Sequence, residues 1–172
     1  LWSRGLGDVY KRQAQAITRA APELDYVAVY TRHDPAGALA LAAQLPLFAL
    51  QLHGQQSAAF IQTLRASLPE TVQLWYALDM TAGEQPPAAP IDRLVLDSGA
   101  GGTGKPFDWA QIPPELCGRA LLAGGLTPEN AQAALQTGVL GLDFNSGLER
   151  ERGVKDAGLI ARAFAAVRAY TP

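Results

Sequence analysis

The feature that most constrains the fold is a regular alternation of short apolar segments with longer amphipathic ones. The apolar segments recur about every 20–25 residues, which is the spacing of β–α units in a parallel sheet. They predict six strands, over 26–30, 48–52, 72–77, 93–96, 119–123 and 140–144. The intervening segments predict helices over 14–21, 34–44, 55–68, 127–138 and 157–170. Proline follows an N-cap candidate at Asp34 and at Thr127, and Gly138 is a predicted helix stop.

Six parallel strands fit two folds, a doubly wound open sheet or part of an eight-stranded (β/α)8 barrel. A barrel normally needs about 200 residues or more, so a barrel formed by 172 residues would lack roughly one βαβ unit.

Composition excludes several function classes. Hydrophobic residues make up 48% of the chain and charged residues 17%, so the chain can build a core. The formal net charge of −2 argues against binding nucleic acid through a basic patch. Charged residues interrupt every apolar stretch before it reaches the length of a membrane span. The single cysteine, Cys117, excludes an internal disulfide framework and a cysteine-rich zinc site. We expect a cytoplasmic protein with neither a nucleic-acid nor a membrane partner.

The first 13 residues, LWSRGLGDVYKRQ, differ from the rest of the chain. They carry no convincing helical or strand period and no apolar region typical of a signal peptide. The run resembles translated vector or adapter sequence, and a poorly ordered terminus is the alternative. We therefore expect a non-native tail over 1–13 and one folded domain over 14–172.

A glycine-rich loop over 99–105 has four interpretations. It matches the dinucleotide-binding pattern G-x-G-x-x-G, but the sequence KPFDW that follows does not open a helix. It also matches G-x-x-x-x-G-K, but Pro106 replaces the Ser or Thr that would hold magnesium. The remaining interpretations are a surface loop and a mobile lid at the carboxyl end of a barrel strand.

Small residues follow the last two predicted strands, as Gly124-Gly125 and as Ser146-Gly147. The corresponding turns of many barrels bind phosphate through backbone N–H groups, although tight turns also favour glycine.

Longer motifs resemble one family. They are LQLHG (50–54), LVLDSG (94–99), GKPFDW (104–109), LAGGLTPEN (122–130), GLDFNSGLE (141–149) and GVKD (153–156). In order and spacing they resemble phosphoribosylanthranilate isomerase of tryptophan biosynthesis, over about residues 14–170. The resemblance implies an incomplete (β/α)8 TIM barrel in which the six strands are strands three to eight and the first βαβ unit is missing. The phrases LDFNS and WYAL are most similar to the bacterial form fused to indole-3-glycerol-phosphate synthase, which would be the partner domain.

The resemblance also implies a reaction. The family converts N-(5'-phosphoribosyl)anthranilate to 1-(2-carboxyphenylamino)-1-deoxyribulose 5-phosphate by an Amadori rearrangement, with no cofactor and no metal. An acid protonates the ring oxygen and opens the ribose, and a base then removes the C2' proton from the iminium intermediate. The substrate is small and phosphorylated, so an anion site is also required.

Matching motifs assign roles by resemblance. Asp97 is the expected general acid. The phosphate site is expected at Gly124, Gly125, Ser146 and Gly147, with Gly102 as a further candidate. Asp143 binds a ribose hydroxyl or makes a structural hydrogen bond. Gln51 and His53 are expected to line the pocket, and the alternative for His53 is that it only stabilises a turn.

The departures from the family concern the base and the anthranilate carboxylate. No Lys-x-Cys-Gly segment, which carries the family's base, and no Ser-Pro-Arg segment, which carries its carboxylate-binding arginine, occurs in the chain. Cys117 precedes a strand and is interpreted as structural, and Tyr76 stands where the family usually has lysine. We expect a truncated isomerase that is inactive alone. The alternatives are a non-catalytic domain that binds a phosphorylated ligand and a different sugar-phosphate barrel enzyme with another base.

Overall fold

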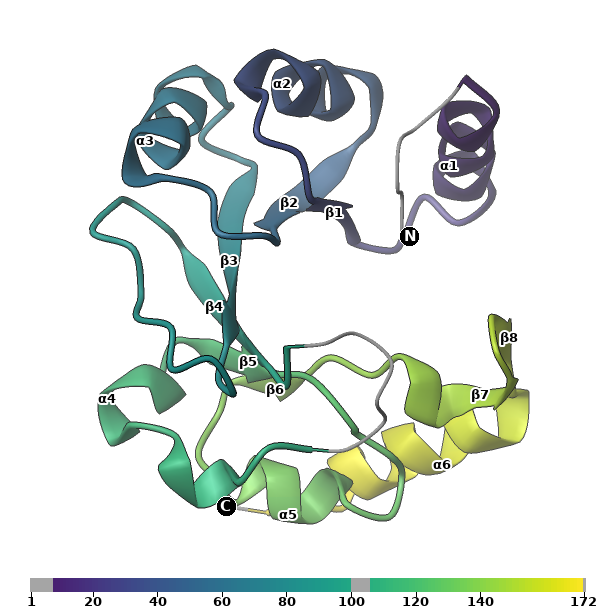
Figure 1. Cartoon of the computed structure of the whole chain (residues 1–172). Helices are drawn as coiled ribbons and strands as arrows, with labels where there is room; N and C mark the ends of the chain where they lie inside the picture. The colour runs from purple at the N-terminus through teal and green to yellow at the C-terminus, as the bar shows by residue number, and fades with distance from the viewer. Residues whose placement is uncertain (1–7, 100–105, 172) are drawn as a thin grey trace. The chain divides into compact units, whose positions relative to one another are not determined.

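The computed structural model describes residues 8–99 and 106–171 (Figure 1). Contacts divide the chain into an N-terminal unit, Leu1–Ala77 with Pro86–Arg93, and a C-terminal unit, Leu78–Gln85 with Leu94–Pro172. The strands of the larger sheet are β1 (Tyr26–Tyr30), β2 (Leu47–Leu52), β3 (Gln73–Asp79), β4 (Arg93–Asp97), β5 (Ala120–Leu122) and β6 (Gly141–Leu142). The α-helices are α1 (Asp8–Ala20), α2 (Pro35–Gln44), α3 (Ala58–Ser67), α4 (Pro114–Cys117), α5 (Ala131–Leu135) and α6 (Ala157–Arg168).

Strand order decides between the two folds that the sequence left open. Among the described residues, six strands form one sheet in the order β1-β2-β3-β4-β5-β6, so each strand lies beside its predecessor in the chain. The pairs β1–β2, β2–β3, β4–β5 and β5–β6 are parallel. A doubly wound sheet reverses its strand order at a switch point, whereas a barrel adds its strands in sequence. The fold is therefore part of a (β/α)8 barrel, as predicted.

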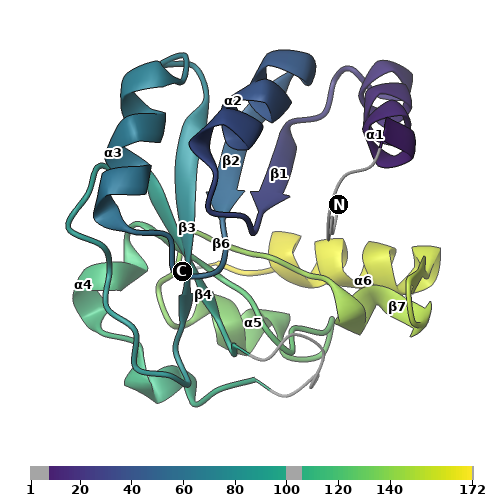
Figure 2. The ribbon, with the colours of Figure 1, turned by 45° about the horizontal axis from the view of Figure 1, so that its top comes forward.

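In the N-terminal unit, α2 and α3 lie side by side over the strands (Figures 1 and 2). Leu50 of β2, Leu74 of β3 and Leu64 of α3 have no exposed surface, so the core lies between the strands and these helices. The predicted cap of α2 is confirmed, because the Asp34 carboxylate accepts a hydrogen bond from Gly37 N at 2.6 Å.

Two predicted helix starts in this unit were wrong. Helix α3 starts at Ala58 rather than at 55, because Gln55 has a positive φ of 59° and Ser57 caps the helix. Helix α1 starts at Asp8, six residues before the predicted start at Ala14. Once the helix over Ala14–Ala20 has formed, extending it costs little free energy, because the preceding residues Lys-Arg-Gln are strong helix formers.

In the C-terminal unit, α5 and α6 lie side by side (Figure 1). Leu94 and Leu96 of β4 and Leu122 of β5 are fully buried. The prediction that Thr127 caps a helix was wrong, since α5 begins only at Ala131. The side chain of Asn130 accepts from Thr127 N and donates to the Gly125 carbonyl, and thereby holds residues 127–130 in a turn.

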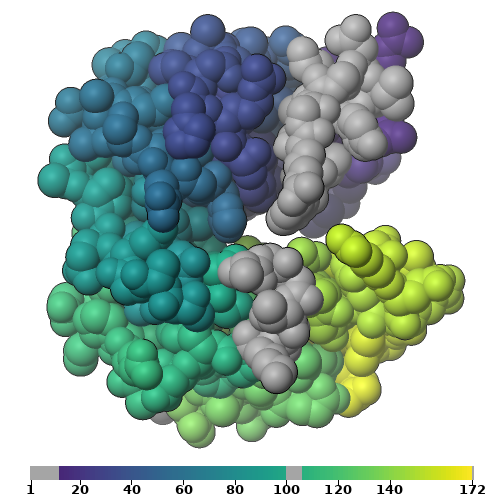
Figure 3. Space-filling view, in the orientation of Figure 1, coloured from purple at the N-terminus to yellow at the C-terminus, as the bar shows by residue number. Residues whose placement is uncertain are grey.

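Short elements of this unit have no period that the sequence could reveal. They are two 3-10 helices, η1 (Trp109–Gln111) and η2 (Ser146–Leu148), and the antiparallel hairpin β7 (Glu149–Glu151) with β8 (Val154–Lys155). Residues near 150, yellow-green in Figure 3, project from the surface of this unit. None of the helices in the described ranges combines the length and apolar character that crossing a membrane requires.

Candidate active site

The carboxyl ends of β4, β5 and β6 carry most of the polar residues that the sequence singled out. Asp97 is the last residue of β4, and Asp143 directly follows β6. Backbone pairing continues past the strand ends, because Ala123 N donates to the Leu96 carbonyl and Asp143 N to the Leu122 carbonyl, both at 2.8 Å. Since carboxyl ends of parallel strands meet at one edge, these residues lie on the edge where barrel enzymes place their active sites.

Asp97 is held by its own loop. Its Oδ1 accepts hydrogen bonds from the backbone N of Ser98 at 2.6 Å and from the Ser98 hydroxyl at 3.5 Å. Its backbone carbonyl accepts from Met80 N at 2.9 Å, which ties the end of β4 to the segment after β3. The carboxyl group therefore has a defined position, and its residue is only partly buried.

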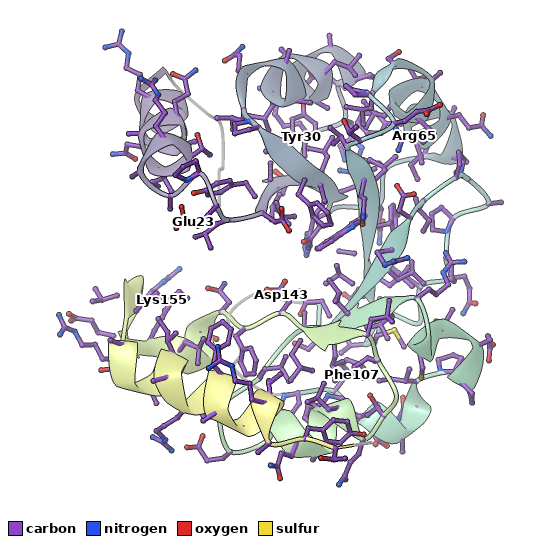
Figure 4. All side chains as sticks on the ribbon, turned by 180° about the vertical axis from the view of Figure 1, so that it is seen from behind. Glu23, Tyr30, Arg65, Phe107, Asp143 and Lys155 are labelled. Atoms are coloured by element: carbon purple, nitrogen blue, oxygen red, sulfur yellow. The ribbon has the colours of Figure 1, made fainter. Side chains whose placement is uncertain are left out.

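Asp143 is electrostatically coupled to Asp97. Its side chain keeps access to solvent, yet burial by the surrounding protein raises its pKa, and the negative charge of Asp97 raises it further. Lys155, a nearby cation, acts in the opposite direction. Figure 4 shows Asp143 and Lys155 on the same side of this unit, away from α5. Burial and the charge of Asp97 thus both disfavour the ionised form of Asp143.

This coupling has a measurable consequence for stability. We expect Asp143→Asn to raise the free energy of unfolding at neutral pH, and the gain to shrink as pH falls towards the ordinary aspartate pKa of 3.8. The native pKa lies above the unfolded one, so ionising Asp143 above its native pKa destabilises the folded state. Urea unfolding of both proteins at neutral pH and at about pH 3.5 tests this.

A companion measurement isolates the contribution of Asp97. Carboxyl NMR should show a lower pKa for Asp143 in the Asp97→Asn variant, because one negative charge has been removed. The matched control is Asp25→Asn, which replaces an exposed aspartate of the other unit and should leave the pKa of Asp143 unchanged. An unaltered Asp143 pKa in Asp97→Asn would contradict the coupling.

The turn after β5 packs directly on Asp97. Gly124 and Gly125 have positive φ angles of 79° and 67°, a conformation that favours glycine. A Cβ on Gly124 would lie 2.8 Å from Asp97 Oδ1 and would overlap the Ser98 hydroxyl. The first glycine turn and the carboxylate are therefore in immediate contact.

The turn after β6 packs on the loop that follows the first glycine turn. A Cβ on Gly147 would overlap the carbonyl oxygen of Leu126. Ser146 and Gly147 open the 3-10 helix η2, where the first N–H groups have no acceptor within the helix. The structure thus brings Asp97, Asp143 and both small-residue turns together in one unit.

The other predicted site residues lie elsewhere. Gln51 is buried in β2, and His53 follows that strand, with its backbone N donating to the Tyr30 carbonyl at 2.9 Å. Both belong to the N-terminal unit. Gly102 lies outside the described residues. Cys117 ends α4, which precedes β5, and its Sγ contacts the Pro113 carbonyl at 3.8 Å.

Sequence reasoning missed the residues that support the two turns. Asn130 fixes the loop after Gly125, and Lys155 contacts Asn145 just before Ser146. The GVKD motif drew attention to the segment that contains Lys155. The spacing of its residues does not reveal which groups Lys155 contacts. Within residues 8–99 and 106–171, no group of three His, Cys, Asp or Glu side chains is arranged to hold a metal.

Comparison with known proteins gives consistent matches. The family model described as "N-(5'phosphoribosyl)anthranilate (PRA) isomerase" matches residues 4–166. "Tryptophan biosynthesis protein TrpCF" of Salmonella typhi is 42% identical over 161 residues, covering 92% of this chain and 35% of that protein. The chain therefore spans about a third of the length of the curated relatives it matches.

Solved structures agree in fold. TrpF from Jonesia denitrificans is similar with a TM-score of 0.77 and 34% identity, over 92% of this chain and 78% of that one. Phosphoribosyl anthranilate isomerase from Thermus thermophilus is similar with a TM-score of 0.80 and 28% identity, over 92% and 80%. These likenesses agree with the strand order in assigning six strands of a (β/α)8 barrel.

Proposed function

This chain belongs to the N-(5'-phosphoribosyl)anthranilate isomerase family, and from that premise we propose that, within a complete barrel, it catalyses the Amadori rearrangement of N-(5'-phosphoribosyl)anthranilate in tryptophan biosynthesis. The observation that carries the proposal is the contact between the Asp97 carboxylate and the Gly124 turn. In the substrate, only the ester oxygen, C5' and C4' separate the phosphate from the ring oxygen. An acid that protonates this oxygen must therefore lie close to the phosphate site.

Asp97 is the proposed general acid. It stands at the end of a strand, and Ser98 N fixes its Oδ1. A proton donated to the ring oxygen opens the ribose and leaves an iminium at C1'. At the same edge, burial and the negative charge of Asp97 raise the pKa of Asp143. Asp143 then binds a ribose hydroxyl.

The phosphate is proposed to bind the two small-residue turns, at Gly124, Gly125, Ser146 and Gly147. Both turns lie at the carboxyl edge, and each requires the absence of a Cβ at one position. Backbone N–H groups at such turns favour an anion without adding a mobile cation. Gln51 and His53 are proposed as pocket residues, and Gly102 as a further phosphate contact.

We expect the chain by itself to turn over substrate at or below detection. Its sequence holds neither the Lys-x-Cys-Gly nor the Ser-Pro-Arg segment of the family, and loss of one general base costs about 10²–10⁴-fold. A chimera that adds the first βαβ unit of the Salmonella typhi relative should gain at least that factor. Comparing the two rates tests the expectation, and turnover of the chain alone close to that of the chimera would contradict it.

A non-catalytic domain that binds a phosphorylated ligand is the second candidate. It is favoured by the presence of both turns in a chain without the family's base segment. Product binding to the chimera without any turnover would support this candidate over the isomerase.

A fused indole-3-glycerol-phosphate synthase domain is the proposed partner. The basis is that TrpCF relatives are about three times as long as the matched region. Sequencing the source DNA upstream of the codon for Ala14 tests this. A reading frame that encodes such a domain, followed by the two missing segments, is the expected result.

A further inference from the structure

Lys155 has an unusually complete set of contacts for a surface lysine. Its Nζ donates to the Asn145 carbonyl at 2.8 Å, to Asn145 Oδ1 at 2.7 Å and to Glu149 Oε1 at 2.8 Å. An ammonium group has three donors, and all three are used here. Lys155 is therefore engaged with the protein rather than available to a ligand.

Glu149 connects the lysine to the β7–β8 hairpin. Its side chain is only 14% exposed, and its second oxygen accepts from Gly153 N at 2.9 Å, across the hairpin turn. Gly153 has a positive φ of 82°, as this turn requires. Lys155 thus joins the hairpin, at Glu149, to the segment after β6, at Asn145.

The connection through Lys155 holds Asn145 in its backbone conformation. Its φ of −133° and ψ of −96° lie outside the helix and strand regions, so its neighbours must hold it in place. Its carbonyl oxygen accepts from both Lys155 and Leu148 N, and the second bond closes η2. Fixing Asn145 therefore fixes Ser146 and Gly147, which follow it.

We propose that Lys155 is a positioning residue for the phosphate site, acting through Asn145 to hold the Ser146-Gly147 turn against the loop after β5. The inference rests on the proposed phosphate site and adds the contacts of Lys155 that order one of its two turns. Lys155 acts indirectly, since Glu149 neutralises its charge and its donors are occupied.

The test is an amide NMR titration of the chain with inorganic phosphate, following Gly124, Gly125, Ser146 and Gly147. Lys155→Gln should raise the Kd at least about fivefold, the equivalent of one hydrogen bond. Arg152→Gln, which removes the same charge from the exposed hairpin turn, is the matched control and should change the Kd less than about twofold.

Glu149→Gln separates positioning from simple attraction. Removing a negative charge near an anion site should tighten phosphate binding if only charge mattered. Positioning predicts weaker binding, because Lys155 loses its connection to the hairpin. Tighter or unchanged binding in Glu149→Gln, or equal effects of Lys155→Gln and Arg152→Gln, would overturn the inference.

Hydrogen exchange in the absence of phosphate distinguishes the two proposals. Exchange of the Leu148 amide should be about tenfold faster in Lys155→Gln than in Arg152→Gln if Lys155 orders the turn. Unchanged exchange overturns the positioning role even if phosphate binds. If wild type shows no phosphate shifts at the four amides while exchange responds as expected, the proposed phosphate site fails and only the ordering of the turn stands.

Discussion

Replacing Asp97 with asparagine in the chimera is expected to lower kcat by about 10²–10⁴-fold and to leave product affinity nearly unchanged. Asparagine keeps the shape of the side chain and can still accept the hydrogen bond from Ser98 N. It cannot transfer a proton to the ring oxygen, so the loss falls on the chemical step. Steady-state kinetics and calorimetric titration of product measure the two quantities separately.

The matched control for this prediction is Asp25→Asn, an exposed aspartate between α1 and β1, which should leave kcat unchanged. A kcat for Asp97→Asn within about threefold of the parent would remove Asp97 from the mechanism. Asp143 would then be the next carboxyl group to test, because it is electrostatically coupled to Asp97.

Substituting alanine for Gly147 is expected to destabilise the chain by about 1–3 kcal/mol and to abolish phosphate shifts at both turns. The new Cβ would overlap the backbone oxygen of Leu126, so one of the two loops must move. A backbone atom cannot rotate away as a flexible side chain can. Urea unfolding gives the stability change, and the phosphate titration gives the loss of binding.

Gly118→Ala is the control for Gly147→Ala. A Cβ on Gly118 meets nothing within 4 Å, and its φ of −66° suits alanine. This variant should be as stable as wild type or slightly more stable, since alanine reduces the freedom of the unfolded chain. If Gly147→Ala kept wild-type stability and phosphate binding, close packing of Gly147 on Leu126 would not be required for either property.

The sequence predicted the strands better than the helix starts. Strand β1 has the bounds that its apolar run predicts, and Asp34 with Pro35 opens α2 as expected. The predicted starts of α3 and α5 were wrong because a side chain or a backbone angle competes with helix formation, as Asn130 does before α5 and Gln55 does before α3. The bonds of Asn130 are local, to residues three and five positions earlier, and a capping pattern of residue types alone does not reveal them.

The candidate site residues could be proposed from the sequence, but the contacts that hold them in place could not. Motifs identified Asp97 and both small-residue turns, and β-strand ends explain why they share one edge. The overlap of Gly147 with Leu126 and the three bonds of Lys155 depend on loop paths that no period encodes. The coupling of Asp143 to Asp97 likewise depends on proximity across two strands.

The order β1-β2-β3-β4-β5-β6 also has a consequence for how the protein is made. Each strand after β1 lies beside the strand synthesised just before it, so none of these five strands has to wait for a distant part of the chain. Contacts of short sequence separation form early and fast. The sheet can therefore grow strand by strand as the polypeptide leaves the ribosome, and the strand made last is an unpaired edge until the next one arrives.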